Sequence, residues 1–231
     1  MEYLHNHFTL EIAPGCFPLS TDSIALSGFV KLPKNARVLD LGAGCGTLGM
    51  LLCASHGDCR ITGIELDENA HNAALNNAAA NKVTDRYSSI CTDLRKIEAA
   101  VCAGAFQVCI SNPPYFSGGI ASKDFANARQ EQSCTLEDLF RSAGWALQWG
   151  GDFFLVHKPE RFAQLCACAV RHNLEPKTVQ LLRHKKDGPV CLVLVQCRKG
   201  GKPGLVWQEQ YLYEADGTPS AYFQSLYHQE V

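Results

Sequence analysis

Segments typical of strands and of helices alternate along the chain from about residue 37, and this alternation limits the possible folds more than any other feature. It predicts an α/β fold with a mainly parallel sheet and helices on both faces. Strands are expected at 37–41, 60–65, 86–91, 106–111, 152–157, 177–182 and 190–197, and helices at 47–56, 69–81, 135–149 and 159–172. The last two strands are joined by a link containing Asp187-Gly188-Pro189, so we expect an antiparallel hairpin there.

The length of 231 residues suits one large α/β domain, placed at 37–231 after an N-terminal extension at 1–36. Hydrophobic residues make up 46% of the chain, which is enough for a substantial core. No stretch approaches the ~18–20 apolar residues of a membrane span, and residues 1–15 do not resemble a signal peptide. We therefore expect a cytoplasmic protein without a membrane partner.

The twelve cysteines are expected to be free thiols. Several, such as Cys109 and Cys197, lie inside apolar runs, where a thiol behaves as a small hydrophobic group. No C-x-x-C spacing occurs, so neither a redox pair nor a metal site is indicated. This pattern predicts a reducing compartment and no bound metal.

The formal net charge of −2 does not favour broad, non-specific binding of nucleic acid. The charge is unevenly distributed, however. Between Lys158 and Lys202 there are ten Lys or Arg residues and three Asp or Glu residues, a net charge of +7. From the residues alone this stretch is either a solvated face or a surface for a polyanion.

A glycine-rich turn follows the first strand, in Asp40-Leu41-Gly42-Ala43-Gly44-Cys45-Gly46. Glycines there allow a sharp turn and let a ligand lie against bare backbone near the start of the next helix. Gly44, Gly46 and Gly49 also satisfy the dinucleotide pattern G-x-G-x-x-G. Glu65 ends the second strand, where its carboxylate can accept both hydroxyls of a ribose. The turn and Glu65 together predict a cofactor that contains adenosine.

Asp93 follows the third strand and has two possible roles. Its carboxylate can accept the amino group of a bound adenine. It can equally cap a helix that begins at Leu94, since Asp is a common N-cap residue.

The sequence Asn112-Pro113-Pro114-Tyr115 follows the fourth strand and predicts the chemistry. Two prolines stiffen the backbone, so the Asn112 side-chain carbonyl and the Pro113 backbone carbonyl can face one point. An amino group at that point donates both hydrogens and turns its nitrogen lone pair towards an electrophilic methyl group. Tyr115 offers a ring on which a planar substrate stacks.

These features together resemble the class I S-adenosylmethionine-dependent amino-methyltransferases, which carry an [ND]-P-P-[YFW] motif. The resemblance implies a Rossmann-like, seven-stranded, mainly parallel sheet with an antiparallel last strand. It implies S-adenosylmethionine as cofactor and methyl transfer to an exocyclic nitrogen of the substrate. The catalytic residues that it implies are Asn112, Pro113, Pro114 and Tyr115. The cofactor contacts that it implies are Asp40, Gly42, Ala43, Gly44, Gly46, Glu65, Leu66, Asp93, Leu94 and Asn112.

Further stretches are similar to the bacterial tRNA(Val) adenine-N6 methyltransferases, which modify the base next to the anticodon. They are residues 17–26, Phe116 with Gly118, residues 128–131, and residues 183–189. This resemblance implies that the N-terminal extension packs by the cofactor, with Thr21 and Asp22 near it, although Asp22 can also cap the following helix. It implies a tRNA partner contacted by Tyr115, Phe116, Lys185, Lys186 and Lys199.

Three other functions remain compatible with part of the pattern. The motif also fits methylation of a glutamine side chain in a protein, but enzymes of that kind usually carry a separate N-terminal helical domain. Methylation of rRNA or DNA fits it as well. A nicotinamide oxidoreductase explains the glycines and Glu65, but it gives residues 112–115 no role.

Overall fold

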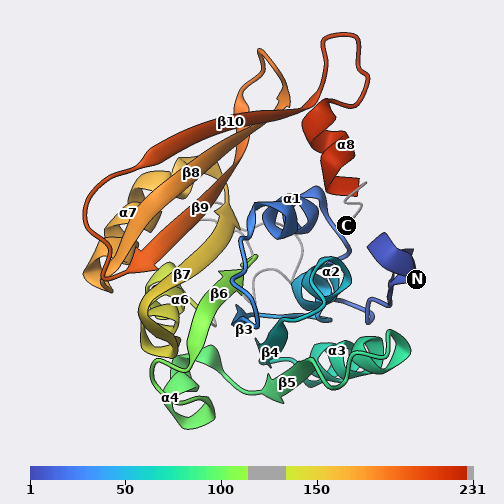
Figure 1. The fold of residues 1–231 in the computed structure, drawn as a ribbon, viewed down its shortest axis with the longest axis vertical. Coiled ribbons are helices and arrows are strands. Elements are labelled where there is room, and N and C mark those ends of the chain that lie inside the picture. The colour runs from blue at the N-terminus through green and yellow to red at the C-terminus, as the bar shows by residue number, and fades with distance from the viewer. Residues whose placement is uncertain (114–133, 228–231) are drawn as a thin grey trace.

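The computed structural model describes residues 1–113 and 134–227, and its centre is one eight-stranded sheet (Figure 1). The strands of this sheet are β3 (Arg37–Leu41), β4 (Arg60–Glu65), β5 (Tyr87–Cys91), β6 (Phe106–Ser111), β7 (Leu147–His157), β8 (Leu174–Lys185), β9 (Val190–Lys199) and β10 (Val206–Tyr213). The α-helices are α1 (Thr21–Phe29), α2 (Thr47–Ser55), α3 (Glu68–Ala80), α4 (Ile97–Ala100), α6 (Leu136–Ala146), α7 (Phe162–Arg171) and α8 (Ala221–Tyr227). Short elements complete the description: β1 (Glu2–Tyr3), β2 (Thr9–Leu10), and the 3-10 turns η1 (His5–His7), η2 (Leu94–Lys96) and η3 (Pro159–Arg161).

The strand order β10-β8-β9-β7-β6-β3-β4-β5 confirms the predicted α/β class. β9 runs antiparallel to both β7 and β8, whereas the other neighbouring strands pair in parallel. The predicted C-terminal hairpin is therefore present as β8 and β9. The prediction of seven strands was wrong by one, because β10 adds a parallel edge strand beside β8.

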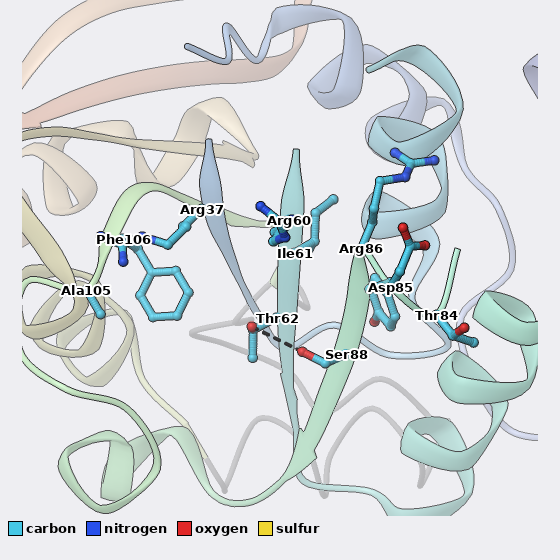
Figure 2. A pocket seen from close by; sticks show the side chains of 11 residues that line it. Arg37, Arg60, Ile61, Thr62, Thr84, Asp85, Arg86, Ser88, Ala105 and Phe106 are labelled. Atoms are coloured by element: carbon cyan, nitrogen blue, oxygen red, sulfur yellow. Dashed lines mark hydrogen bonds between the residues drawn. The ribbon is translucent and has the colours of Figure 1, made fainter. Parts of the chain in front are cut away.

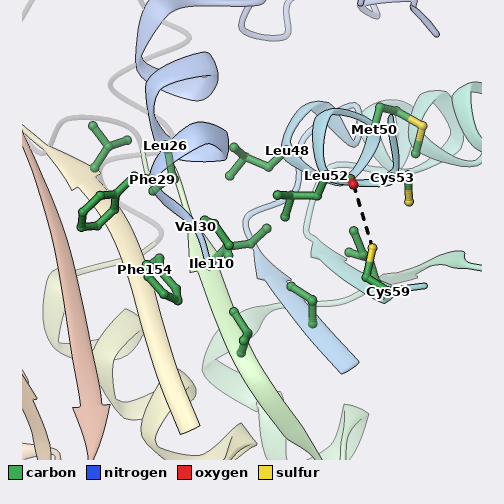
Figure 3. Close-up of a cluster of buried hydrophobic side chains, with 14 of the residues drawn as sticks. Leu26, Phe29, Val30, Leu48, Met50, Leu52, Cys53, Cys59, Ile110 and Phe154 are labelled. Atoms are coloured by element: carbon green, nitrogen blue, oxygen red, sulfur yellow. Dashed lines mark hydrogen bonds between the residues drawn. The ribbon is translucent and has the colours of Figure 1, made fainter. Parts of the chain in front are cut away.

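Two hydrophobic clusters lie on opposite faces of the sheet, because neighbouring residues of a strand point to opposite sides. Figure 1 shows α1, α2 and α3 on one face and α4, α6 and α7 on the other. Along β7, Phe154 packs with the first group of helices and Phe153 with the second. In Figure 3, side chains of α1 and α2 meet Ile110 and Phe154 on the first face.

The boundary between α6 and β7 differs from the prediction. The sequence indicated a helix to residue 149, but α6 ends at Ala146 and β7 starts at Leu147. Leu147 already has extended backbone angles, with a φ of −71° and a ψ of 138°. Gly150, inside β7, has a φ of +80°, where only glycine is unstrained. The register of β6 against β7 shifts at the same level, between Phe106 and Val108.

All twelve cysteines are free thiols, and several of them are buried. Within residues 1–113 and 134–227, no group of three or more His, Cys, Asp or Glu side chains is placed to hold a metal ion. None of the helices in these two ranges is long and apolar enough to cross a membrane.

Candidate active site

A cleft of about 460 Å³ opens at the carboxyl ends of β3, β4 and β6, the edge at which the sequence predicts a ligand. Its wall combines the N-terminal segment with the loops that follow these strands. The residues that line it are Pro14, Gly15, Cys16, Phe17, Pro18, Ser20, Asp22, Ser23, Asp40, Gly42, Ala43, Gly44, Cys45, Thr47, Leu48, Glu65, Asp67, Asn69, Ala70, Asn112 and Pro113.

The glycine-rich loop presents bare backbone to this cleft. Gly42 and Gly44 have φ values of +76° and +55°, and a Cβ atom added at either would meet no atom within 4 Å. The Glu65 carboxylate braces the loop, because its Oε2 accepts the Gly44 N–H at 2.8 Å and its Oε1 accepts the Asp67 N–H at 2.8 Å. Each carboxylate oxygen has a further lone pair, so acceptance of ribose hydroxyls stays compatible with these bonds.

Gly46 and Gly49 have a different task from Gly42 and Gly44. A Cβ atom at Gly49 would lie 2.2 Å from Cε2 of Tyr87, and one at Gly46 would lie 2.9 Å from the Tyr87 hydroxyl. Neither glycine lines the cleft. These two members of the G-x-G-x-x-G pattern therefore let α2 pack closely on the Tyr87 ring of β5, and the structure does not bring Gly46 to the ligand space.

Asp40 is the buried acid of the cleft. Its side chain is 1% exposed, and neither carboxylate oxygen has a hydrogen-bond partner within the described residues. Burial, with a smaller contribution from the charge of Glu65, raises the pKa of Asp40 from 3.8 to about 8. An unpartnered buried carboxyl group that lines a cleft marks a place where a polar or cationic ligand supplies the missing contact.

Asn112 directly follows β6, and β3 lies between β6 and the strand that ends at Glu65. The side-chain Nδ2 of Asn112 donates to Ser23 Oγ at 2.9 Å, so its side-chain carbonyl oxygen is the atom left for a ligand. Pro113 is buried and lines the cleft as well. Pro114, Tyr115 and Phe116 lie outside the described residues.

The N-terminal extension contributes the start of α1 to the cleft. Ser20 is the N-cap, since its hydroxyl accepts the Ser23 N–H, so the alternative that Asp22 caps this helix was wrong. Asp22 lines the cleft, and burial raises its pKa while the charge of Lys158 lowers it. Thr21 begins the helix but is not among the lining residues.

Besides Thr21 and Gly46, three further predicted cofactor contacts are not among the residues that line this cleft: Leu66, Asp93 and Leu94. Leu66 is 54% exposed. The Asp93 side chain caps η2 and forms a salt bridge with Arg95 at 2.6 Å, which confirms its capping role. Hydrogen bonds from Arg95 lower the pKa of Asp93. The contact between Asp93 and an adenine stays a prediction. It would require the Asp93 carboxylate to bind the adenine and Arg95 at the same time.

Residues 23–166 match the family described as the methyltransferase small domain, which spans more than half of the chain. The chain belongs to this family. It is a methyltransferase, as residues 112–115 predicted.

Two relatives of this methyltransferase share one description. A "tRNA1(Val) (adenine(37)-N6)-methyltransferase" of Dickeya chrysanthemi is 33% identical over 187 residues, covering 80% of this chain and 74% of the relative. A protein of the same description from Aeromonas hydrophila is 29% identical over 212 residues, covering 87% and 85%. Among solved structures, a predicted O-methyltransferase from Agrobacterium tumefaciens superposes with a TM-score of 0.76 at 21% identity, covering 89% and 95%.

S-adenosylmethionine is the cofactor, and the cleft has the features to hold it. The open backbone at Gly42 and Gly44 has room for a ligand, Glu65 offers acceptors for hydroxyl groups, and Asp40 offers an unpartnered acid. Together these residues would hold a cation that also carries a ribose. A nicotinamide cofactor is therefore not required to explain the glycine pattern.

Two residues that the sequence analysis missed shape this methyltransferase site. Ser23 holds the Asn112 amide, and Asn77 of α3 holds the segment before α1. Asn77 Oδ1 accepts the Glu11 N–H, while its Nδ2 donates to the carbonyl oxygens of Glu11 and Cys45. The spacing of Asn77 and Asn81 on one helical face was the signal available, since Asn81 bonds Thr9 in the same way.

The predicted substrate lysines lie at opposite ends of the sheet. β8 runs in the direction of β7, so Lys185 and the adjoining Lys186 lie at the end that carries the cleft. β9 runs the other way and places Lys199 beside the start of β7, where its Nζ donates to Leu147 O at 2.7 Å. The structure therefore does not bring Lys199 together with the other two, because the antiparallel pairing separates them.

A second pocket, of about 310 Å³, lies at the amino ends of β3, β4, β5 and β6, away from the cleft (Figure 2). Arg37, Arg60 and Phe106 are among its lining residues, and Thr62 and Ser88 share a 3.2 Å hydrogen bond within it. None of the site residues predicted from the sequence lines this second pocket.

Proposed function

We propose that this methyltransferase transfers the methyl group of S-adenosylmethionine to N6 of adenine 37 in tRNA1(Val). The observation that carries the proposal is Asn112, whose Nδ2 is held by Ser23 at the rim of the cleft, which leaves its carbonyl oxygen available to a substrate amino group. The proposed substrate is the one named in the descriptions of two relatives, which are 33% and 29% identical to this chain.

The proposed chemistry uses two hydrogen-bond acceptors. The Asn112 carbonyl and the Pro113 backbone carbonyl accept the two hydrogens of the adenine amino group, which turns its lone pair towards the donor. The bound cofactor supplies an electrophilic methyl group on a sulfonium. The amino nitrogen would take this methyl group as the carbon–sulfur bond breaks, with S-adenosylhomocysteine as the other product. The methylated nitrogen then releases one proton to water, so no general base is required.

His157 supports this account because it is a weak base. It lies at the end of β7 with no exposed surface, and burial lowers its pKa to about 4. Its Nδ1 accepts the Lys158 N–H at 2.8 Å, which gives the imidazole a structural task. His157 is not among the cleft residues, so it does not take the proton.

Nucleoside mass spectrometry tests the substrate directly. The purified enzyme with S-adenosylmethionine should form N6-methyladenosine in a tRNA1(Val) transcript. It should form none in a matched transcript with guanine at position 37, which lacks the N6 amino group. Product in both transcripts would contradict the position, and methyl transfer to a protein glutamine in place of the tRNA would contradict the substrate class.

Asn112→Ala tests the role of the amide. The variant removes one of two acceptors that strengthen in the transition state, so kcat should fall on the order of 100-fold. Calorimetry should show S-adenosylmethionine binding close to that of the parent, and no binding of NAD. A variant that keeps near-normal kcat would show that the carbonyl has no catalytic task.

The cytoplasm is the proposed compartment. tRNA is modified there, and the twelve unpaired thiols are compatible with a reducing environment. Fractionation of cells that produce the protein should place it with the soluble tRNA pool, and recovery in an oxidising compartment would contradict the proposal.

A further inference from the structure

The side-chain amide of Asn112 is useful to the reaction in only one of its two orientations. Its carbonyl oxygen accepts a hydrogen bond, whereas its NH₂ group only donates. A half-turn about the last side-chain bond exchanges the two and would present donors to the substrate amino group, which must itself donate. Something in the site therefore has to select the orientation.

Ser23 is placed to make this selection. It lies in the first turn of α1, is 5% exposed, and lines the same cleft as Asn112. Its Oγ lies 2.9 Å from Asn112 Nδ2, across 89 residues of sequence. No other hydrogen bond of the Asn112 side chain is present within the described residues, so this contact alone distinguishes the nitrogen from the oxygen.

The N-cap of α1 gives Ser23 a hydroxyl partner that is compatible with this polarity, since either hydroxyl of the pair can donate. Ser20 Oγ accepts the Ser23 N–H, and the two hydroxyl oxygens are 3.4 Å apart. A Ser23 hydroxyl that donates to Ser20 keeps its lone pairs towards Asn112, where they can receive only the NH₂ group. The cap thereby connects the helix start to the orientation of an amide at the end of β6.

We infer that Ser23 is a positioning residue, which fixes the Asn112 amide so that its carbonyl faces the substrate amino group. The inference rests on the proposed function for its substrate, but the orientation itself is a property of the free protein. Ser23 acts through Asn112 and does not contact the reacting atoms.

Ser23→Ala removes the acceptor without adding volume, and alanine is a good helix former. Removal of one hydrogen bond predicts a roughly three- to tenfold fall in kcat on the tRNA transcript. KM and the Kd for S-adenosylmethionine should change by less than about twofold. Ser23→Thr, which restores the hydroxyl, should recover most of the kcat. Unchanged kcat in Ser23→Ala, or no recovery in Ser23→Thr, would overturn the inference.

Asn112→Asp separates orientation from packing, because a carboxylate presents an oxygen in either orientation. In this background, Ser23→Ala should change kcat by less than about twofold. An equal decrease in both backgrounds would show that Ser23 acts by supporting the helix, and would overturn the inference.

Nuclear magnetic resonance of the ¹⁵N-labelled free protein gives a readout that needs no substrate. The side-chain NH₂ resonances of Asn112, identified by their absence from Asn112→Asp, should move upfield in Ser23→Ala and stay near their place in Ser23→Thr. Unmoved resonances in Ser23→Ala would overturn the inference. If these shifts appear while the tRNA transcript is not methylated, the proposed substrate fails and the orienting role stands.

Discussion

At the scale of single residues, Asp40 is the acid most perturbed by its surroundings in the cleft. Its pKa of about 8 means that the carboxyl group is mostly protonated at neutral pH in the free protein. A cation in the cleft favours the ionised form, since opposite charges lower the pKa of an acid. Cofactor binding and deprotonation of Asp40 are thereby linked.

The same shift predicts how stability depends on pH. In the unfolded chain Asp40 ionises near 3.8, whereas in the folded protein it holds its proton to about 8. The contribution of Asp40 to folding is therefore complete below about pH 4 and is lost as the pH rises towards 8. The free energy of unfolding of the parent should fall relative to Asp40→Asn by up to about 1.4 kcal/mol per pH unit in this window.

Urea unfolding of both proteins at several values between pH 5 and 9 measures this difference. The difference in unfolding free energy between the parent and Asp40→Asn cancels the titration of the other groups, because both proteins contain those groups. Parallel stability curves for the two proteins would show that Asp40 has no raised pKa.

At the scale of secondary-structure elements, α3 holds the N-terminal segment beside the cleft. Asn77 is 3% exposed, and both the oxygen and the nitrogen of its side-chain amide form hydrogen bonds. Their partners are the backbone of Glu11 and the Cys45 carbonyl of the glycine-rich loop. One side chain therefore connects the segment before α1 to the loop after β3. The position of residues 14–18 on the cleft wall depends on this connection.

Asn77→Ala should be costly, because it leaves the buried Cys45 carbonyl and the partly buried backbone groups of Glu11 without these partners. The free energy of unfolding should fall by about 1–3 kcal/mol, and the Kd for S-adenosylmethionine should rise. Asn76→Ala is the matched control, since Asn76 is the neighbouring residue of the same helix and is exposed. Thermal unfolding and calorimetry would contradict this role if the two variants behaved alike.

Local patterns predicted the elements around the cleft, but not the contacts between them. The limits of β3, β4 and β6 were predicted to the residue, because each is a short apolar run. β10 was missed because its first four residues are exposed, so its pairing with β8 leaves no hydrophobic signal. The bond from Ser23 to Asn112 spans 89 residues, and no local spacing contains it.

At the scale of the whole molecule, the basic C-terminal stretch divides between the two ends of the sheet. Residues 158–202 carry a net charge of +7, but antiparallel pairing sends Lys199 to the end opposite the cleft. Lys185 and Lys186 remain at the end where a tRNA would have to approach. Only part of that charge is therefore available to a substrate bound at the cleft.

Replacement of Lys185 and Lys186 by alanine should weaken tRNA binding and lower its salt dependence. The slope of log K against log salt should fall by roughly one for each phosphate that the variant no longer neutralises. Lys202→Ala is the matched control, because Lys202 is exposed and follows β9 at the opposite end. Filter binding at several salt concentrations measures both variants, and equal slopes would mean that the paired lysines face only solvent.

The hydrogen bond between Ser23 and Asn112 also has a consequence for biosynthesis. At elongation rates of about 5–20 residues per second, the ribosome needs on the order of 4 to 18 s to extend the chain over these 89 residues. During that interval α1 is already synthesised while its partner at the end of β6 is not. A nascent chain released before residue 112 would carry the glycine-rich loop and Glu65 but would lack the amide that Ser23 holds.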